Sequence, residues 1–72
     1  MEIKNMTIKP FDIVVLNQDI PKMKLKAGMK GAVLDIYTKP TLAYEVEFLD
    51  TLGNDITTLA VLPEQITKLN SQ

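Results

Sequence analysis

Residues 25–33 read L-K-A-G-M-K-G-A-V, and this stretch decides the fold of the 72-residue chain. Two glycines, Gly28 and Gly31, stand three residues apart, immediately ahead of a β-branched run. Because glycine lacks a Cβ atom, either residue can take a positive φ angle or let a neighbouring backbone approach closely. The pair therefore predicts the turn into a strand at the corner of a small β-structure.

Two strands are predicted on either side of this turn. Residues 11–16 (F-D-I-V-V-L) are rich in β-branched side chains and follow Pro10, which can begin a strand but not occupy the middle of a central one. Residues 32–37 alternate imperfectly, which predicts a second strand that either contains a β-bulge or is partly apolar on both faces. Between these strands, residues 22–27 alternate lysines with apolar side chains, which predicts an extended arm with one apolar edge and one solvent-exposed edge.

Three further strands are predicted in the second half of the chain. Residues 43–48 alternate strictly, with an inward apolar set and an outward acidic set, namely Tyr44, Val46 and Phe48 against Glu45 and Glu47. Gly53 and Asn54 signal the next turn, and a fourth strand begins at Asp55 or Ile56 and runs to Leu62. Pro63 ends it; residues 63–65 predict a 3₁₀ turn, and residues 66–69 a short last strand.

Five short strands without helical periodicity predict an all-β fold, either a barrel or a sandwich, with the 3₁₀ turn before the last strand. A chain of this length has room for one domain. We expect that domain at residues 10–69, preceded by an N-terminal arm at residues 1–9 and followed by a C-terminal tail at residues 70–72.

The composition argues against most catalytic and cofactor chemistry. The chain has no Cys, His, Arg or Trp, so the commonest zinc ligands and the usual acid–base side chain are missing. Glu45 and Glu47 form a carboxylate pair two residues apart, but outward acids on an antiparallel strand are more often a solvated face. We therefore expect no enzymatic activity, no cofactor and no metal. The lack of a long apolar segment or signal peptide predicts a cytoplasmic protein without a membrane partner.

Charge is distributed unevenly along the chain. Residues 1–34 carry a net charge of +3 and residues 35–72 a net charge of −4, which sum to −1. The basic half contains the candidate partner-binding residues, namely Lys22, Met23, Lys24, Leu25, Lys26, Met29 and Lys30. Two alternatives stay open: the lysines form a solvated edge that discourages aggregation, and the apolar residues cap an open end of the barrel.

The segments F-D-I-V-V-L, L-K-A-G-M-K-G-A-V, Y-E-V-E-F and L-P-E-Q-I, in this order, resemble the family called domain of unknown function 4926 over residues 11–69. The resemblance implies a small five-stranded SH3-like barrel and no established activity. It also implies a small bacterial protein that is encoded in some cases beside a toxin-like protein, and hence an antitoxin-like or immunity-like role. The chain departs from the family pattern at Lys39-Pro40-Thr41, where an Asp-Gly hairpin is usual, and at Ala32, where threonine is usual.

Three functional hypotheses follow. The first is a non-enzymatic module that binds another protein, encoded by an adjacent gene, through residues 19–30. The alternative is a nucleic-acid-binding module similar to the KOW element, with Lys24, Lys26 and Lys30 as contacts; the absence of Arg and Trp and the acidic net charge count against it. The third is a homodimer formed through edge strands.

Overall fold

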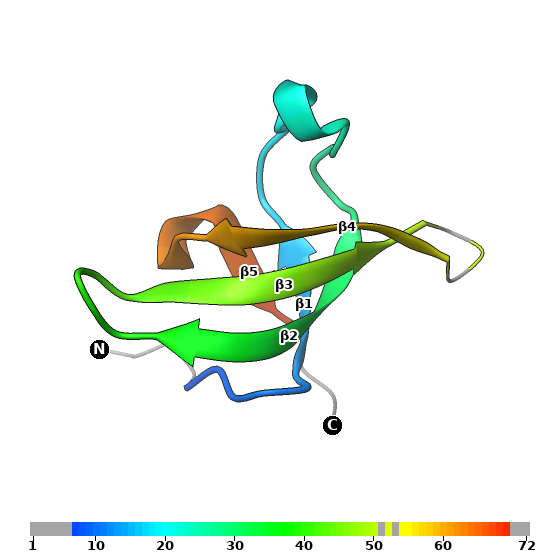
Figure 1. Ribbon diagram of the computed structural model, residues 1–72. Coiled ribbons are helices and arrows are strands. Elements are labelled where there is room, and N and C mark those ends of the chain that lie inside the picture. Colours follow the sequence, from blue (N-terminus) through cyan, green and yellow to red (C-terminus); the bar gives the residue numbers. More distant parts are fainter. Residues whose placement is uncertain (1–6, 51, 53, 70–72) are drawn as a thin grey trace, which may run out of the picture.

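The computed structural model describes residues 7–50, 52 and 54–69. The expected arm and tail lie partly or wholly outside these residues, and so does Gly53 of the expected turn. Within them, five antiparallel strands form one sheet in the order β4-β3-β2-β1-β5 (Figure 1). The elements are β1 (Ile13–Leu16), η1 (Pro21–Met23), β2 (Lys30–Tyr37), β3 (Ala43–Leu49), β4 (Asp55–Val61), η2 (Pro63–Gln65) and β5 (Ile66–Lys68), where η marks a 3₁₀ turn.

The all-β prediction is confirmed, including the 3₁₀ turn at Pro63 that precedes the last strand. The Gln65 side chain closes this turn by accepting the Leu62 N–H at 2.8 Å, while the Gln65 N–H donates to the Leu62 carbonyl. A closed barrel would need a hydrogen-bonded ladder between β4 and β5. Among the described residues no such ladder is present, and barrel closure stays a prediction.

The core lies on one face of this sheet and draws on every strand. Its buried side chains are Val14, Leu16, Leu25, Val33, Tyr44, Val46, Phe48, Val61 and Ile66. The inward positions predicted for β3, Tyr44, Val46 and Phe48, are confirmed. Of the two alternatives expected for β2, the structure shows the bulge, because the β2–β3 register shifts between Val33 and Asp35. Each fully buried aliphatic or aromatic side chain contributes about 1.5 to 3 kcal/mol, so this set supplies most of the stabilisation of a small domain.

The two corner glycines have different structural roles. Gly28 has a φ angle of +95°, in the region that side chains disfavour, and nothing lies within 4 Å of the position its Cβ would take. Gly31 pairs with Val14 on β1 and Phe48 on β3, and a Cβ there would lie 2.6 Å from Val46 Cγ1. Gly28 therefore makes the turn, and Gly31 allows close approach of two strands.

The first strand begins later than expected, at Ile13 instead of Phe11. The Asp12 N–H donates to the Lys9 carbonyl across Pro10 and Phe11, and Phe11 has a φ angle of +75°. The Phe11 N–H donates to the Val33 carbonyl, and the Val33 N–H donates to the Asp12 carbonyl. This pattern is a type II turn leading into a G1 β-bulge, with phenylalanine at the position that glycine usually occupies. The turn therefore takes the first two residues of the predicted strand.

Candidate functional site

The candidate site is the loop of residues 19–30, called the lysine loop below, which projects from the sheet between β1 and β2 (Figure 1). The extended arm expected over residues 22–27 is wrong. Residues 21–23 form the 3₁₀ turn η1, and Lys24 follows in the left-handed conformation at φ 60°. Ile20 and Leu25 exchange backbone hydrogen bonds of 2.9 and 3.1 Å, so that the loop folds back on itself as a small closed hairpin.

Leu25 anchors this hairpin in the core. Its side chain is 1% exposed, and Ile20 and Met23 pack against the same core from the loop, as Met29 does from the entry to β2. Leu25 is therefore corrected from a partner-binding residue to a structural anchor, because a side chain that is fully buried cannot contact a partner. Met23 and Met29 are partly buried and keep part of their surface accessible.

Hydrogen bonds fix the second half of the loop. The Asp19 carboxylate accepts the Ala27 N–H at 2.9 Å. The Leu16 carbonyl accepts the Gly28 N–H at 2.8 Å, and the Leu16 N–H donates to the Met29 carbonyl at 2.9 Å. The loop is thus held to β1 on both sides of Gly28, and it needs little further ordering to present its side chains.

The four lysines of the loop remain as surface residues. Lys22, Lys24, Lys26 and Lys30 are all exposed. The ion pair between Lys68 and Asp12 lies away from the loop, at the start of β1. The loop therefore carries four exposed positive charges.

Two hollows in the described part of the structure border the lysine loop. The smaller, of about 370 Å³, lies beside η1 and is lined by Asp19, Pro21, Lys24, Leu25 and Lys26. The larger, of about 650 Å³, is lined by Lys26, Ala27, Gly28, Met29, Lys30, Leu49 and Asp50. Lys26 lines both hollows. The larger hollow combines an apolar lining from Met29 and Leu49 with two exposed lysines and the acidic Asp50.

Leu49 and Asp50 were missed by the sequence reasoning. They come from the end of β3 and the connection that follows, and the β2–β3 register places Gly31 opposite Phe48. The next pair in this register brings Lys30 close to Leu49. The sequence predicts the hairpin of β2 and β3. The proximity of Lys30 and Leu49 can be predicted only once the register of this hairpin is known, because a shift of one residue moves every side chain to the other face.

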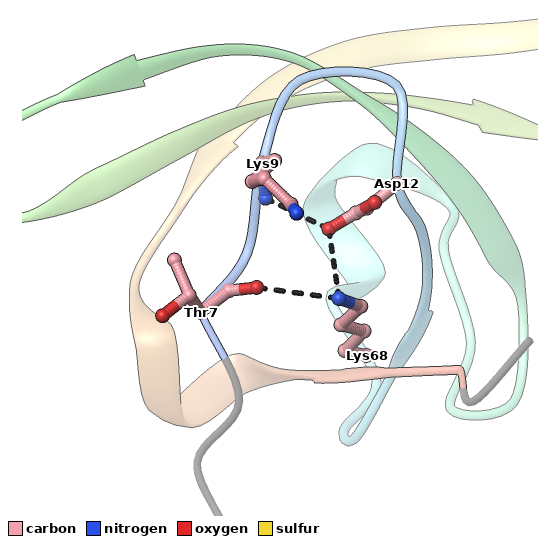
Figure 2. Close-up of polar contacts among 4 residues, drawn as sticks. All are labelled: Thr7, Lys9, Asp12 and Lys68. Carbon is pink, nitrogen blue, oxygen red and sulfur yellow. Dashed lines mark hydrogen bonds and ion pairs between the residues drawn. The ribbon is translucent and has the colours of Figure 1, made fainter.

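The end of β1 opposite the lysine loop is closed by a polar clasp (Figure 2). Lys68 Nζ lies 3.3 Å from Asp12 Oδ2 and donates to the Thr7 carbonyl at 3.3 Å. Asp12 Oδ2 also accepts the Lys9 N–H at 2.8 Å. The Lys9 N–H and, secondarily, the Lys68 ammonium hold the pKa of Asp12 below its ordinary value, although partial desolvation opposes them. These groups tie the N-terminal segment to β5, which is a structural role.

The predicted carboxylate pair on β3 lies on the side of the sheet away from the core. Glu45 and Glu47 are partly exposed, and Tyr37 Oη donates to Glu45 Oε1 at 3.0 Å. This hydrogen bond is the main cause of a raised pKa of Tyr37, since losing the phenolic proton would set two negative charges side by side. The described residues contain no group of three or more side chains that could hold a metal ion, and no helix among them is long and apolar enough to cross a membrane.

The chain matches the model of a protein family. No curated protein and no solved structure matches the chain. The model of the family described as "Domain of unknown function (DUF4926)" matches residues 11–68, which include all five strands and the whole lysine loop. The matched region begins at the Phe11 bulge and ends at Lys68 of the polar clasp. On this match, the chain belongs to the family of domain of unknown function DUF4926.

Proposed function

We propose that this chain is a small, non-enzymatic protein-interaction module that binds an acidic partner through the lysine loop. The observation that carries the proposal is the hollow of about 650 Å³ that is lined by Met29 and Leu49 together with the exposed Lys26 and Lys30. Such a surface can bury an apolar side chain of the partner while the lysines pair with carboxylates beside it. The partner in this proposal is the product of an adjacent gene, in an antitoxin-like or immunity-like pairing in the cytoplasm.

The fixed backbone of the loop supports this use. A binding surface that is already ordered loses less conformational entropy on association than a mobile one. The bridge between Ile20 and Leu25 and the hydrogen bonds from Leu16 supply that order before any partner arrives. Positive charge on a projecting loop also speeds the encounter with an acidic surface.

Charge reversal on the loop tests the proposal. The chain is co-expressed with the product of the adjacent gene, and the affinity of the purified pair is measured by titration calorimetry. Lys26→Glu and Lys30→Glu should each weaken binding at least about tenfold, equivalent to about 1.4 kcal/mol. Lys39→Glu is the matched control, because Lys39 is exposed on the β2–β3 connection outside the loop, and it should leave the affinity unchanged.

Two results would contradict the proposal. One is the absence of binding to the neighbouring product, or binding that is indifferent to both loop variants. The other is a mobility shift with RNA or DNA at low salt that weakens as Lys24, Lys26 and Lys30 are neutralised, since this behaviour belongs to a nucleic-acid-binding module.

A further inference from the structure

The two edges of the sheet are built differently. The β5 edge is only three residues long, contains Lys68 and follows Pro63, and all of these features discourage the addition of another strand. The β4 edge is seven residues long, Asp55–Val61, and its single charged residue is the first. From Ile56 to Leu62 the sequence is I-T-T-L-A-V-L, with no charge and no proline. The β4 edge therefore lacks the devices that protect β5.

The open hydrogen-bonding groups of β4 can be assigned from the ladder. Val33 and Met29 direct backbone groups to β1. Because the backbone groups of successive residues in a strand point to opposite sides, Ala32 directs its N–H and C=O groups to Glu47 on β3. Alternation along β3 then directs Tyr44, Val46 and Phe48 towards β4.

These three residues of β3 lie opposite Val61, Leu59 and Thr57. The residues between them, Thr58 and Ala60, consequently point their N–H and C=O groups to the open edge. Leu62 does not add to this set, because both of its backbone groups are bonded to Gln65. Among the described residues, the N–H and C=O groups of Thr58 and Ala60 are thus left for a partner strand.

We propose that β4 pairs antiparallel with β4 of a second copy of this chain, with Leu59 on the two-fold axis. Thr58 of each copy then lies opposite Ala60 of the other, which satisfies all four open backbone groups of each copy. Leu59 faces Leu59 of the second copy on the core side. Ile56 faces Leu62 of the second copy on the outer side.

Burial and charge support the second copy as the occupant. Ile56 and Leu62 are 36% and 40% exposed in the single chain, and they cover each other across the two-fold axis. Leu59 is already packed partly against the core, and its counterpart extends that core across the axis. No like charges meet in this register, since Asp55 lies at the far end of each strand.

Amide exchange measured residue by residue tests the pairing. In a single chain the Leu59 amide is protected by β3, whereas the Thr58 and Ala60 amides exchange rapidly. In the proposed dimer all three are protected, and light scattering gives twice the chain mass of 8.1 kDa. A single-chain mass with rapid exchange at Thr58 and Ala60 at millimolar concentration would overturn the proposal.

Two edge variants and one control sharpen the test. Ala60→Pro removes an N–H that, by this assignment, has no bond among the described residues, so it should leave the monomer folded and abolish the dimer. Thr58→Lys places two lysines about 7 to 8 Å apart across the axis and should weaken the dimer at least tenfold. Thr41→Lys makes the same charge change at an exposed position on the β2–β3 connection and should have no effect.

A dimer that survives both edge variants pairs through another surface, which refutes the inference. None of these positions lies in the lysine loop, so these variants test the dimer independently of the proposed protein-binding function.

Discussion

Replacement of Gly31 by alanine should remove most of the stability of the protein. The added Cβ would lie 2.6 Å from Val46 Cγ1, 2.8 Å from the Glu47 carbonyl oxygen and 3.0 Å from Phe48 Cδ1. Carbon atoms in proteins pack best about 3.5 to 4.0 Å apart, so the first two contacts are severe overlaps. Val46 is fully buried and β-branched, which leaves it almost no freedom to rotate away.

The overlap with the Glu47 carbonyl is the harder one to relieve. This oxygen belongs to the ladder between β2 and β3, where Ala32 lies opposite Glu47, and its displacement weakens the pairing of two central strands. Overpacking of a well-packed core costs about 1 to 3 kcal/mol, and with a backbone overlap we expect a loss near the upper end, about 3 kcal/mol. A domain of this size has only about 3 to 5 kcal/mol in total.

Urea unfolding followed by circular dichroism measures this loss, with Gly28→Ala as the matched control. Gly28 has open space around it, so alanine there meets only the strain of a positive φ angle, about 1 to 2 kcal/mol. Gly31→Ala should therefore unfold at clearly lower urea than Gly28→Ala, with a similar slope against denaturant. A loss below about 1 kcal/mol at Gly31, or a larger loss at Gly28, would refute the packing argument.

Three further predictions concern the turn and the two polar contacts. Phe11→Gly should raise the free energy of unfolding by about 0.5 to 1 kcal/mol, because relief of the left-handed strain exceeds the added chain entropy and the side chain is 79% exposed; a lower thermal midpoint would contradict this. Asp12 has a lowered pKa in the fold, so its stabilisation is present above the ordinary carboxyl pKa and is lost as pH falls through the folded pKa. The unfolding midpoint of Asp12→Asn should accordingly change less than that of the unmodified chain between about pH 5 and pH 2, and an equal change would exclude the clasp as the cause. Glu45→Gln should lower the pKa of Tyr37 towards its ordinary value, because the hydrogen bond to the carboxylate is the main cause of the raised pKa; NMR titration of the Tyr37 ring measures it, and no change would show that another group is responsible.

Much of the sheet could be predicted because its signals are local. The strict alternation of Tyr44, Val46 and Phe48 identifies a half-buried strand without reference to any other part of the chain. Pro63 has a fixed φ angle and no N–H, and these properties alone end β4 and begin a 3₁₀ turn. The imperfect alternation around Leu34 is also a local signal, and it is compatible with the bulge in β2.

The parts that could not be predicted depend on distant contacts. The alternation of Lys22, Met23, Lys24 and Leu25 fits an extended arm, and only the insertion of Leu25 into the core turns it into a closed hairpin. Phe11 was placed in a strand because residue type gives no warning that a bulky side chain will adopt a positive φ angle. That conformation is set by the turn at Pro10 and the bonds to Val33.

In the lysine loop, the residue needed for folding, Leu25, differs from the residues proposed to bind a partner. Leu25 belongs to the core, and truncation of a buried leucine to alanine costs about 2 to 5 kcal/mol, which is comparable with the whole stability of so small a domain. The neighbouring Lys24 and Lys26 are exposed, so we expect charge-changing substitutions of their side chains to leave the fold in place. Loss of binding through Leu25 would therefore report unfolding, whereas the proposed recognition surface consists of the exposed lysines together with Met29 and Leu49.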